Sequence, residues 1–374
     1  MTATSPHTPL APKAGQRLAG LRVILVGPSA AQDDGIAAQP ALLATGLQME
    51  GASVVRVATN PRLPGMAELV PVVGDVLRRA RFRALLERAI GAGADVLHVQ
   101  GEPWQEFWDF TAYALRQAKL AGMRTVLRWD GGDTGRFLAS DPRGIRSALS
   151  YADRVIVPSG YLRGVFRSRL GMRARVIPSL VDDPGVERPP ARRQGRLRLL
   201  CARPLEACHG IDVVLAAASQ AVEMGVDLQL VIAGEGPERS RLGNLALARL
   251  GDRASFLGGT SRERLHELLR ETDVLVDGSW ADECPAVLAE ALAAGVPVAA
   301  TNAGAIPWIV EDGSTGFLTP PGDALALAES IANFDADRDA LAGFAWRAKI
   351  NALRWTWDAL RDYWSAVHRA RRTA

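Results

Sequence analysis

The sequence predicts an α/β fold made of two doubly wound parallel-sheet domains. Short β-branched or aliphatic runs alternate with longer amphipathic segments along its 374 residues, a pattern typical of parallel strands covered by helices. The alternation is interrupted at residues 181–196, where Pro, Gly and charged side chains gather as they do in linkers. The length allows each half a hydrophobic core of its own.

The expected elements follow from the aliphatic runs. The predicted strands are 23–26, 54–57, 96–99, 125–127 and 155–157 in the first half, and 197–201, 228–233, 274–276 and 298–300 in the second. Residues 1–19 lack the apolar core of a signal peptide, so we expect a disordered tail there. The expected domains are then 20–180 and 197–340, joined by the linker 181–196. The last segment, 341–374, has a Trp-rich helical pattern.

Composition argues against several classes of protein. The net charge is +3, Lys occurs at positions 13, 119 and 349 alone, and no basic run is interleaved with aromatic residues, so we expect no nucleic-acid partner. The three cysteines lack paired spacing and the five histidines form no i,i+4 pair, which argues against a zinc site and for reduced thiols in a cytoplasm. No apolar stretch of about 18 residues occurs, so we expect a cytoplasmic protein that does not span a membrane.

The most informative segment is 282–290, with the sequence DECPAVLAE. Its acids, Asp282 and Glu290, stand eight positions apart around an expected helix start, where Pro285 suits the first helical position. A buried strand ending near residue 276 precedes it, so Asp282 lies at the mouth of a strand-loop-helix unit, where α/β proteins bind ligands. Unpaired amides at 284–287 favour an anion, and the two acids favour sugar hydroxyls.

This spacing resembles the Glu-seven-residues-Glu signature of the retaining, nucleotide-sugar-dependent glycosyltransferases of family 4, with Asp282 in place of the first Glu. Further segments follow in that family's order: AGEGP at 233–237, FLGG at 256–259, TNAGAIP at 301–307, VEDGSTGFL at 310–318 and PPGD at 320–323. The resemblance covers most of the second half. It implies the GT-B fold, in which two Rossmann-like domains face each other across a cleft and the C-terminal helix crosses back to the first domain.

The resemblance implies roles for residues of the second domain. Glu290 is expected to hold the ribose of a nucleoside-diphosphate sugar, and Asp282 the hydroxyls of the transferred sugar. Arg203, whose guanidinium suits phosphate oxygens, is expected to bind the diphosphate. So are the residues at the helix start, namely Glu283, Cys284, Pro285, Ala286 and Val287.

Other positions fit the family's pattern less well. His209 stands where the family has Lys, so this position adds a positive charge to the diphosphate site only when the imidazole ring is protonated. Gly234 and Gly236 let the backbone approach a ligand, or simply make a tight turn. Gly35, in the first domain, resembles the glycine loop that approaches the donor, and a plain loop explains it equally well. The family commonly has a His near position 130, beside the reacting sugar, and this chain has Asp130 there.

Two features of the first half admit two interpretations each. His98 fits a family habit of placing His at a strand end, and it also suits a satisfied core histidine. The segment 76–88 is a basic amphipathic helix, which either contacts a membrane surface or is solvated and packs on its own domain. The first alternative places the protein at the inner face of the membrane.

The sequence therefore predicts a metal-independent retaining glycosyltransferase that moves a sugar from a nucleoside-diphosphate donor to a hydroxyl acceptor. Asp130 and Asp282 are the expected catalytic residues, and the donor is a substrate, so no cofactor is expected. Two alternatives stay open. One is a degenerate homologue that binds a nucleotide sugar without catalysis, and the other is a nucleotide-sugar epimerase of the same architecture.

Overall fold

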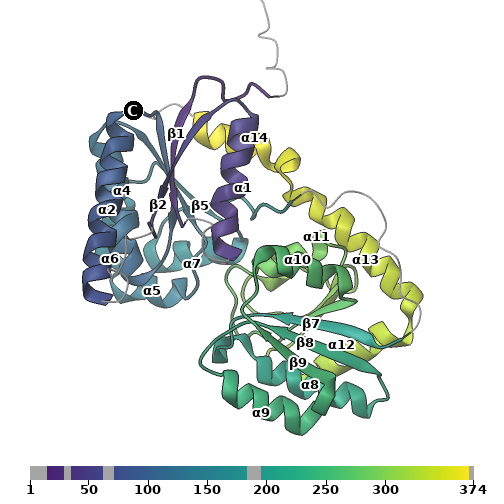
Figure 1. Ribbon diagram of the computed structural model, residues 1–374. Helices are drawn as coiled ribbons and strands as arrows, with labels where there is room; N and C mark the ends of the chain where they lie inside the picture. Colours follow the sequence, from purple (N-terminus) through teal and green to yellow (C-terminus); the bar gives the residue numbers. More distant parts are fainter. Residues whose placement is uncertain (1–14, 29–34, 62–70, 183–194, 370–374) are drawn as a thin grey trace, which may run out of the picture.

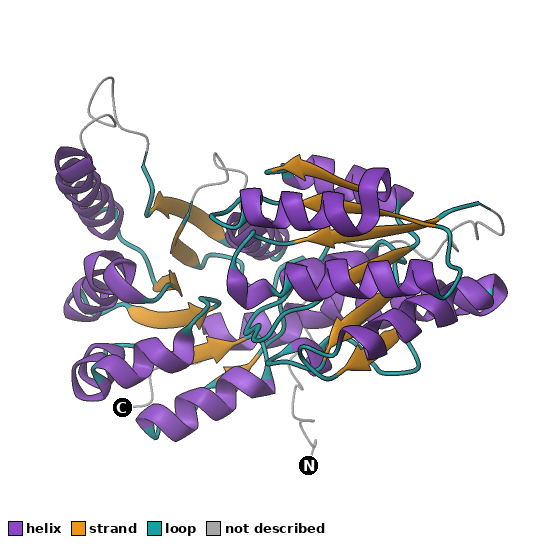
Figure 2. Cartoon of the chain, turned by 90° about the horizontal axis from the view of Figure 1, so that it is seen from below, coloured by secondary structure: helices purple, strands orange, loops and turns teal. Residues whose placement is uncertain are grey.

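The structure is a computed structural model that describes residues 15–28, 35–61, 71–182 and 195–369. It contains two parallel sheets of six strands each, and helices lie on both faces of each sheet (Figures 1 and 2). The predicted fold class, two doubly wound parallel-sheet domains, is confirmed.

The first domain has the strand order β2-β1-β3-β4-β5-β6, and every neighbouring pair is parallel. Its strands are β1 (Arg22–Gly27), β2 (Ser53–Ala58), β3 (Val96–Gly101), β4 (Arg124–Trp129), β5 (Arg154–Val157) and β6 (Arg175–Val176). Its helices are α1 (Gly35–Met49), α2 (Pro71–Gly91), α3 (Trp104–Glu106), the π-helical turn η2 (Phe107–Ala112), α4 (Tyr113–Leu120), α5 (Thr134–Ser140), α6 (Pro142–Leu149) and α7 (Gly160–Leu170). Strands β3 and β4 are buried at every position, as central strands of a doubly covered sheet should be.

The second domain has the order β12-β11-β10-β7-β8-β9, again all parallel. Its strands are β7 (Leu197–Ala202), β8 (Leu228–Ala233), β9 (Ala254–Gly258), β10 (Val274–Asp277), β11 (Val298–Thr301) and β12 (Gly316–Thr319). Its helical segments are η3 (Ala207–His209), α8 (Ile211–Glu223), α9 (Arg239–Leu250), η4 (Gly251–Arg253), α10 (Arg262–Glu271), α11 (Ala286–Ala293), η5 (Ile306–Trp308), α12 (Ala324–Ala336) and α13 (Arg338–Ala352). The chain reverses its winding between β7 and β10, which makes this pair the topological switch point.

The hydrophobic cores follow from the alternation of side chains along the strands. In β1, Ile24 and Val26 belong to one buried cluster, and Val23 and Leu25 belong to another. Because successive side chains of a strand point to opposite faces, the two clusters lie on the two faces of the sheet. The second sheet repeats this arrangement with its own pair of clusters.

Local signals explain where several helices begin and end. The Ser159 side chain accepts the N–H of Leu162 at 3.2 Å at the start of α7, and Gly171 ends that helix in the left-handed conformation with φ 63°. Asp323 and Asp337 cap α12 and α13 in the same way as Ser159.

The C-terminal segment reaches both domains. Helix α13 packs on the second domain, where Ala348 and Ala352 join its core. The chain then passes through η6 (Leu353–Trp355) into α14 (Trp357–Arg369), which lies against the first domain (Figure 1). There Trp364 is fully buried among side chains of the first sheet.

Some expected boundaries differ from the structure. Residues 15–19, expected to belong to a disordered tail, pack on the first domain, because the Leu18 side chain is fully buried in its core. Residues 183–194 of the expected linker and residues 1–14 of the expected tail lie outside the described residues. Strands β6, β9 and β12 were not predicted. None of the described helices combines the length and apolar character needed to cross a membrane.

Candidate active site

The switch point of the second sheet holds a buried ion pair. Arg203 follows β7 directly, and Asp277 is the last residue of β10. The Nε of Arg203 lies 2.5 Å from the Oδ2 of Asp277, and both side chains are buried. Asp277 also accepts the N–H of Ser279 at 2.9 Å. Arg203, the residue predicted to bind the diphosphate, therefore lies at the crevice where doubly wound sheets bind ligands. One side of its guanidinium is already paired with Asp277.

Asp282 contacts the other side of the same guanidinium. Its Oδ2 forms an ion pair with Nη2 of Arg203, although the angles do not meet hydrogen-bond geometry. Its Oδ1 accepts the N–H of Cys284 at 3.0 Å, and its carbonyl accepts the N–H of Ala305 at 2.6 Å. The structure thus brings together Asp282 and Arg203, which two separate sequence motifs had assigned to the same donor site.

The three charges influence one another's protonation. Burial raises the pKa of Asp282, and Asp277 adds to this effect, against the pull of Arg203. For Asp277 burial acts in the same direction, but Arg203 and the bonds from Ser279 outweigh it and hold its pKa below the ordinary value. The two carboxylates raise the pKa of Arg203 despite its burial. The guanidinium therefore stays charged, and Asp282 is the acid of this group that protonates more readily.

Gly234 and Gly236 support the loop that carries Arg203. A Cβ at Gly234 would lie 1.9 Å from the carbonyl oxygen of Arg203, and one at Gly236 would lie 2.5 Å from that of Leu205. Only glycine permits this close packing of two backbones. These contacts explain why both positions need glycine, and they hold the loop of Arg203 in place.

His209 belongs to the same loop, in η3. Its ring is half-buried beside Arg203, Asp282 and Asp277. Burial lowers the pKa of His209 and Arg203 lowers it further, against the effect of the acids. The ring is therefore neutral at pH 7. The loop is tied to the β10–α11 loop by the N–H of Trp280, which donates to the carbonyl of Cys208 at 2.9 Å.

The expected anion-binding amides are partly occupied. Pro285 was predicted as the first helical residue, but it is the N-cap, and α11 begins at Ala286. The N–H of Cys284 is donated to Asp282, and that of Ala286 to the Cys284 carbonyl at 2.8 Å. Pro285 has no N–H. Among residues 284–287, all of which the structure describes, Val287 therefore has the one N–H without an acceptor, so its amide is the one left for a ligand.

Glu290 faces a different part of the second domain from Asp282. Its carboxylate is buried in α11, 3.6 Å from the Nε of Arg262 at the start of α10. Burial raises the pKa of Glu290, and Arg262 opposes this. Glu290 and Arg262 line a pocket together with Asp182, His266 and Arg270. The two motif acids thus belong to one strand-loop-helix unit but to separate polar clusters.

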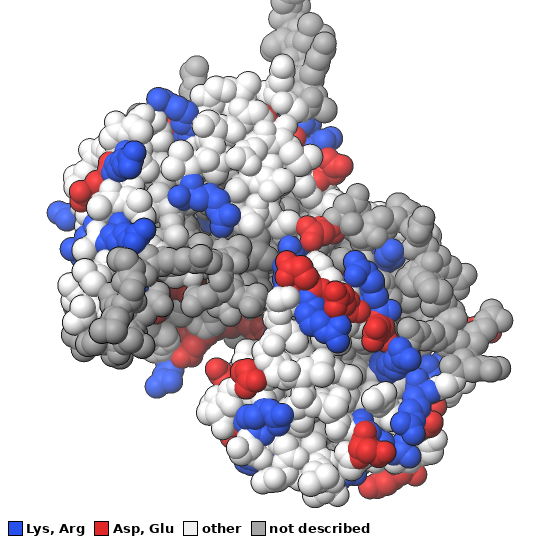
Figure 3. Space-filling model, viewed as in Figure 1, with Lys and Arg blue, Asp and Glu red and all other residues white. Residues whose placement is uncertain are grey.

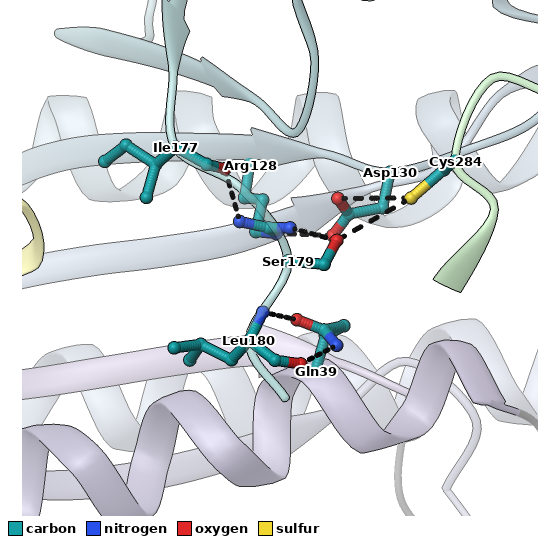
Figure 4. A network of polar contacts seen from close by, with 7 residues as sticks. All are labelled: Gln39, Arg128, Asp130, Ile177, Ser179, Leu180 and Cys284. Atoms are coloured by element: carbon teal, nitrogen blue, oxygen red, sulfur yellow. Dashed lines mark hydrogen bonds and ion pairs between the residues drawn. The ribbon is translucent and has the colours of Figure 1, made fainter. Parts of the chain in front are cut away.

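Asp130 is held at the end of β4 in the first domain (Figure 4). Its Oδ2 lies 2.6 Å from the Nε of Arg128, which also donates to the Ile177 carbonyl at 3.3 Å and to the Ser179 hydroxyl at 3.0 Å. Its Oδ1 lies 3.9 Å from the Cys284 thiol of the second domain. The two predicted catalytic acids therefore flank one loop, since Cys284 contacts Asp130 and its N–H bonds to Asp282.

Glu283 joins the two domains. Its carboxylate accepts the N–H of Thr134 at 2.7 Å and that of Gly135 at 3.3 Å, at the start of α5 in the first domain. Next to it, an apolar pocket between the domains is lined by Pro158, Cys284 and the half-exposed Trp308. The side chain of Glu283, assigned from the sequence to the donor site, is engaged in this contact.

Two further candidates are placed by the structure. Gly35 is the first residue of α1, and Asp33 and Asp34 of its loop lie outside the described residues. His98 is buried in β3, where its Nδ1 lies 3.1 Å from Nε2 of His368 in α14. His98 is therefore a core histidine with a polar partner.

The sequence reasoning missed Asp277 and Arg128, both of which carried a signal. Asp277 is an acid at the end of an otherwise apolar strand, and such a buried charge needs a partner. Arg128 stands two positions before Asp130, and residues i and i+2 of a strand share one face. Together the site offers a charged guanidinium, a helix start and several carboxylates, a set that suits a phosphorylated, hydroxyl-rich ligand.

Comparison with known proteins identifies the class. Residues 187–349 match the family described as Glycosyl transferases group 1. Over 268 residues the chain is 31% identical to a GDP-mannose-dependent alpha-(1-6)-phosphatidylinositol monomannoside mannosyltransferase of Mycobacterium tuberculosis, covering 65% of this chain and 69% of the relative. The chain therefore belongs to the group 1 glycosyltransferases.

Solved structures show the same fold. Sucrose-phosphate synthase of Thermosynechococcus elongatus is similar with a TM-score of 0.77 and 21% identity, covering 93% of this chain and 98% of that one. HepE of Anabaena, solved in complex with UDP and glucose, has a TM-score of 0.67 and 19% identity, covering 92% and 98%. The predicted GT-B fold is confirmed.

Proposed function

We propose that the protein is a retaining glycosyltransferase that moves a sugar from a nucleoside-diphosphate donor to a hydroxyl acceptor. The observation that carries this proposal is the group of Arg203, Asp277 and Asp282 at the switch point of the second sheet. It places a guanidinium that stays charged next to a carboxylate that suits sugar hydroxyls, in a chain that belongs to the group 1 glycosyltransferases.

The proposed division of labour keeps the roles that the sequence motifs assign to these residues. Arg203 and the Val287 amide bind the diphosphate, Asp282 binds the transferred sugar, and Glu290 binds the ribose. The acceptor enters from the first domain, past Asp130. In the proposed reaction the bond from the anomeric carbon to the donor phosphate breaks, a bond to the acceptor oxygen forms on the same face, and the leaving phosphate takes the acceptor proton. Positioning and charge stabilisation would supply most of the catalysis.

The proposal includes transfer without a divalent metal or cofactor, because Arg203 supplies positive charge where a diphosphate would lie. The test is transfer of a labelled sugar from UDP, GDP, ADP and dTDP donors, with and without an acceptor extract and with and without EDTA. We expect acceptor-dependent transfer that survives EDTA. Loss of transfer with EDTA and its return with manganese would contradict the metal-independent step.

A binding protein without catalysis is the second candidate, because Asp130, one of the expected catalytic residues, is already paired with the buried Arg128. The same assay separates the two functions. A donor that stabilises the protein against heat in a thermal-shift screen, with neither transfer nor hydrolysis, would establish binding alone. Conversion of the donor to an epimer without any acceptor would establish the epimerase.

We also propose that α2 contacts an anionic membrane surface, on the cytoplasmic side. Val76, Leu77 and Leu85 of this helix are exposed, and Arg81 and Arg83 flank them. Figure 3 shows Lys and Arg side chains on the side of the first domain where Figure 1 places α2. Flotation with anionic vesicles tests the contact, which should be lost when both arginines are changed to Glu. Equal flotation of the variant would refute it.

A further inference from the structure

The loop after β7 gathers three side chains that can bind a metal. A carboxylate oxygen of Glu206, the thiol of Cys208 and a ring nitrogen of His209 all lie within 4.8 Å of one another. The Sγ of Cys208 lies 3.8 Å from Oε2 of Glu206. In tetrahedral zinc sites, bonds of about 2.3 Å to sulfur and about 2.0 Å to oxygen place these two atoms about 3.5 Å apart. The sulfur and oxygen thus already lie close to the spacing that zinc requires.

The backbone of this loop is held in place from several sides. The N–H of Leu205 donates to the Glu235 carbonyl at 2.8 Å, and that of His209 donates to the Glu206 carbonyl at 3.1 Å. At the end of the loop, a Cβ at Gly210 would lie 2.0 Å from the carbonyl oxygen of Gly278, so the loop packs directly on the β10–α11 loop. A metal bound here would need side-chain rotation and little backbone movement.

His209 gives a second, independent observation. Its Nδ1 is inaccessible to solvent and has no hydrogen-bond partner among the described residues. Buried polar atoms normally have a partner, and each exception calls for an explanation. If the ring of His209 rotated and one of its nitrogens coordinated a metal, the unpartnered Nδ1 would be explained.

We propose that Glu206, Cys208 and His209 form a Zn²⁺ site in the loop after β7, which also carries Arg203. Thiolate and imidazole ligands select zinc over magnesium or calcium, which prefer oxygen ligands. Three protein ligands leave a fourth position for water, as in zinc sites that are open to an outside ligand. His209 is shared with the expected diphosphate site, but zinc binding is measured without any donor, so its test does not depend on the proposed function.

Zinc binding forms the Zn–S bond and releases the proton of the Cys208 thiol to solvent, so the metal replaces that proton on the sulfur.

The test uses the full chain, kept reduced and freed of metal by a chelator. Zn²⁺ is titrated by calorimetry at neutral pH, and Co²⁺ is added as a spectroscopic substitute. We expect one Zn²⁺ per chain and a tetrahedral cobalt spectrum with a thiolate charge-transfer band. Cys208→Ser and His209→Gln should each weaken Zn²⁺ binding by at least about tenfold, since loss of even an outer partner of a ligand typically costs this much.

The matched controls are His266→Gln and Glu238→Gln, which lie outside the cluster and should bind Zn²⁺ like the wild type. Circular dichroism of all variants verifies that the fold is kept, which is expected because Cys208 is exposed and His209 is only half-buried. The proposal is overturned if the wild type binds no Zn²⁺, if Cys208→Ser binds as tightly as the wild type, or if the cobalt complex lacks the thiolate band.

Discussion

The carboxylate of Glu283 accepts the N–H of Thr134 at 2.7 Å, so a residue of the second domain caps a helix of the first. Helix α5 has no side-chain cap from its own N-cap residue, Asp133, whose backbone is left-handed with φ 54°. The first N–H groups of a helix need an acceptor and attract negative charge. The cap therefore exists only while the two domains are close together.

Replacing Glu283 by Ala should favour separation of the domains. Hydrogen bonds to a charged group contribute about 1.5–3 kcal/mol, so the equilibrium between closed and open forms should shift by about tenfold or more. Small-angle scattering should report a larger radius of gyration. Asp141→Ala is the control, because Asp141 caps α6 within the first domain by accepting the N–H of Gly144 at 2.9 Å. Identical scattering from Glu283→Ala and the wild type would show that the cap does not hold the domains.

Replacing Arg203 by Met should destabilise the second domain, because two buried carboxylates lose their counter-charge. Breaking a buried ion pair from one side costs about 3–5 kcal/mol. The additional change Asp277→Asn should restore part of that loss. Urea unfolding followed by Trp fluorescence measures both. Arg241→Met is the surface control, since the pair of Arg241 with Glu238 is exposed to solvent and is expected to contribute little to stability. An unchanged midpoint for Arg203→Met would mean that the pair is not formed.

Glu290→Gln should weaken donor binding about tenfold while the fold is kept. Removing one charge-assisted hydrogen bond to a ribose hydroxyl costs about 1.5–3 kcal/mol. Calorimetry with the donor identified in the thermal-shift screen gives the dissociation constant. Glu267→Gln serves as control, because Glu267 is exposed on α10 and pairs with Arg264 at 2.8 Å. If the two variants bind equally well, Glu290 does not contact the donor.

The sequence predicted the central strands and missed mostly the edges. Strands β6, β9 and β12 all lie at sheet edges. An edge strand is covered incompletely, and β9 accordingly shows no fully buried position. Without an apolar run, its sequence carries no strand signal. The central strand β10 is buried at every position and was recognised from its aliphatic residues.

The sequence could predict those residues of the candidate site that belong to a local motif. Arg203 and Asp282 were both singled out by motifs, and the structure brings them into contact. The contact of Glu283 with Thr134 joins residues 149 positions apart. It depends on how the domains close, and no spacing within one motif encodes that.

Donor affinity should rise as the pH falls if His209 faces the diphosphate. In the free protein burial and Arg203 lower the pKa of His209, while a bound anion would raise it. As the pH falls, donor affinity begins to rise near the pKa of His209 in the complex. It goes on rising down to the lower pKa of His209 in the free protein. Because the free value lies below the ordinary 6.5 or so, the rise should continue below pH 6. Calorimetry with a nucleoside diphosphate from pH 8 to pH 5.5 measures it, and His209→Gln should flatten the profile. Parallel profiles would exclude His209 from the phosphate site.

The buried pair of His98 and His368 should make the protein unstable in mild acid. The Nδ1 of His368 lies 2.8 Å from the Trp364 carbonyl and so carries the proton that it donates. Its Nε2 is then the acceptor, and the Nδ1–H of His98 donates to it. Both rings are neutral in this arrangement. Burial lowers the pKa of His368 to about 4, and burial together with His368 and Arg128 lowers that of His98.

Since each unfolded ring titrates near pH 6.5, the unfolded state binds more protons than the folded state below that value. Stability is therefore complete above about pH 7 and falls as the pH drops from 6.5 toward 4. His368 alone should cost about 2 kcal/mol between pH 7 and pH 5. Urea midpoints at these two values measure the loss. His368→Gln should lose less stability over this interval. His266→Gln is the comparison on α10: burial lowers the pKa of this half-buried ring too, but less than that of His368, so this variant should stay closer to the wild type. An equal loss in His368→Gln and the wild type would show that the pair does not set the acid sensitivity.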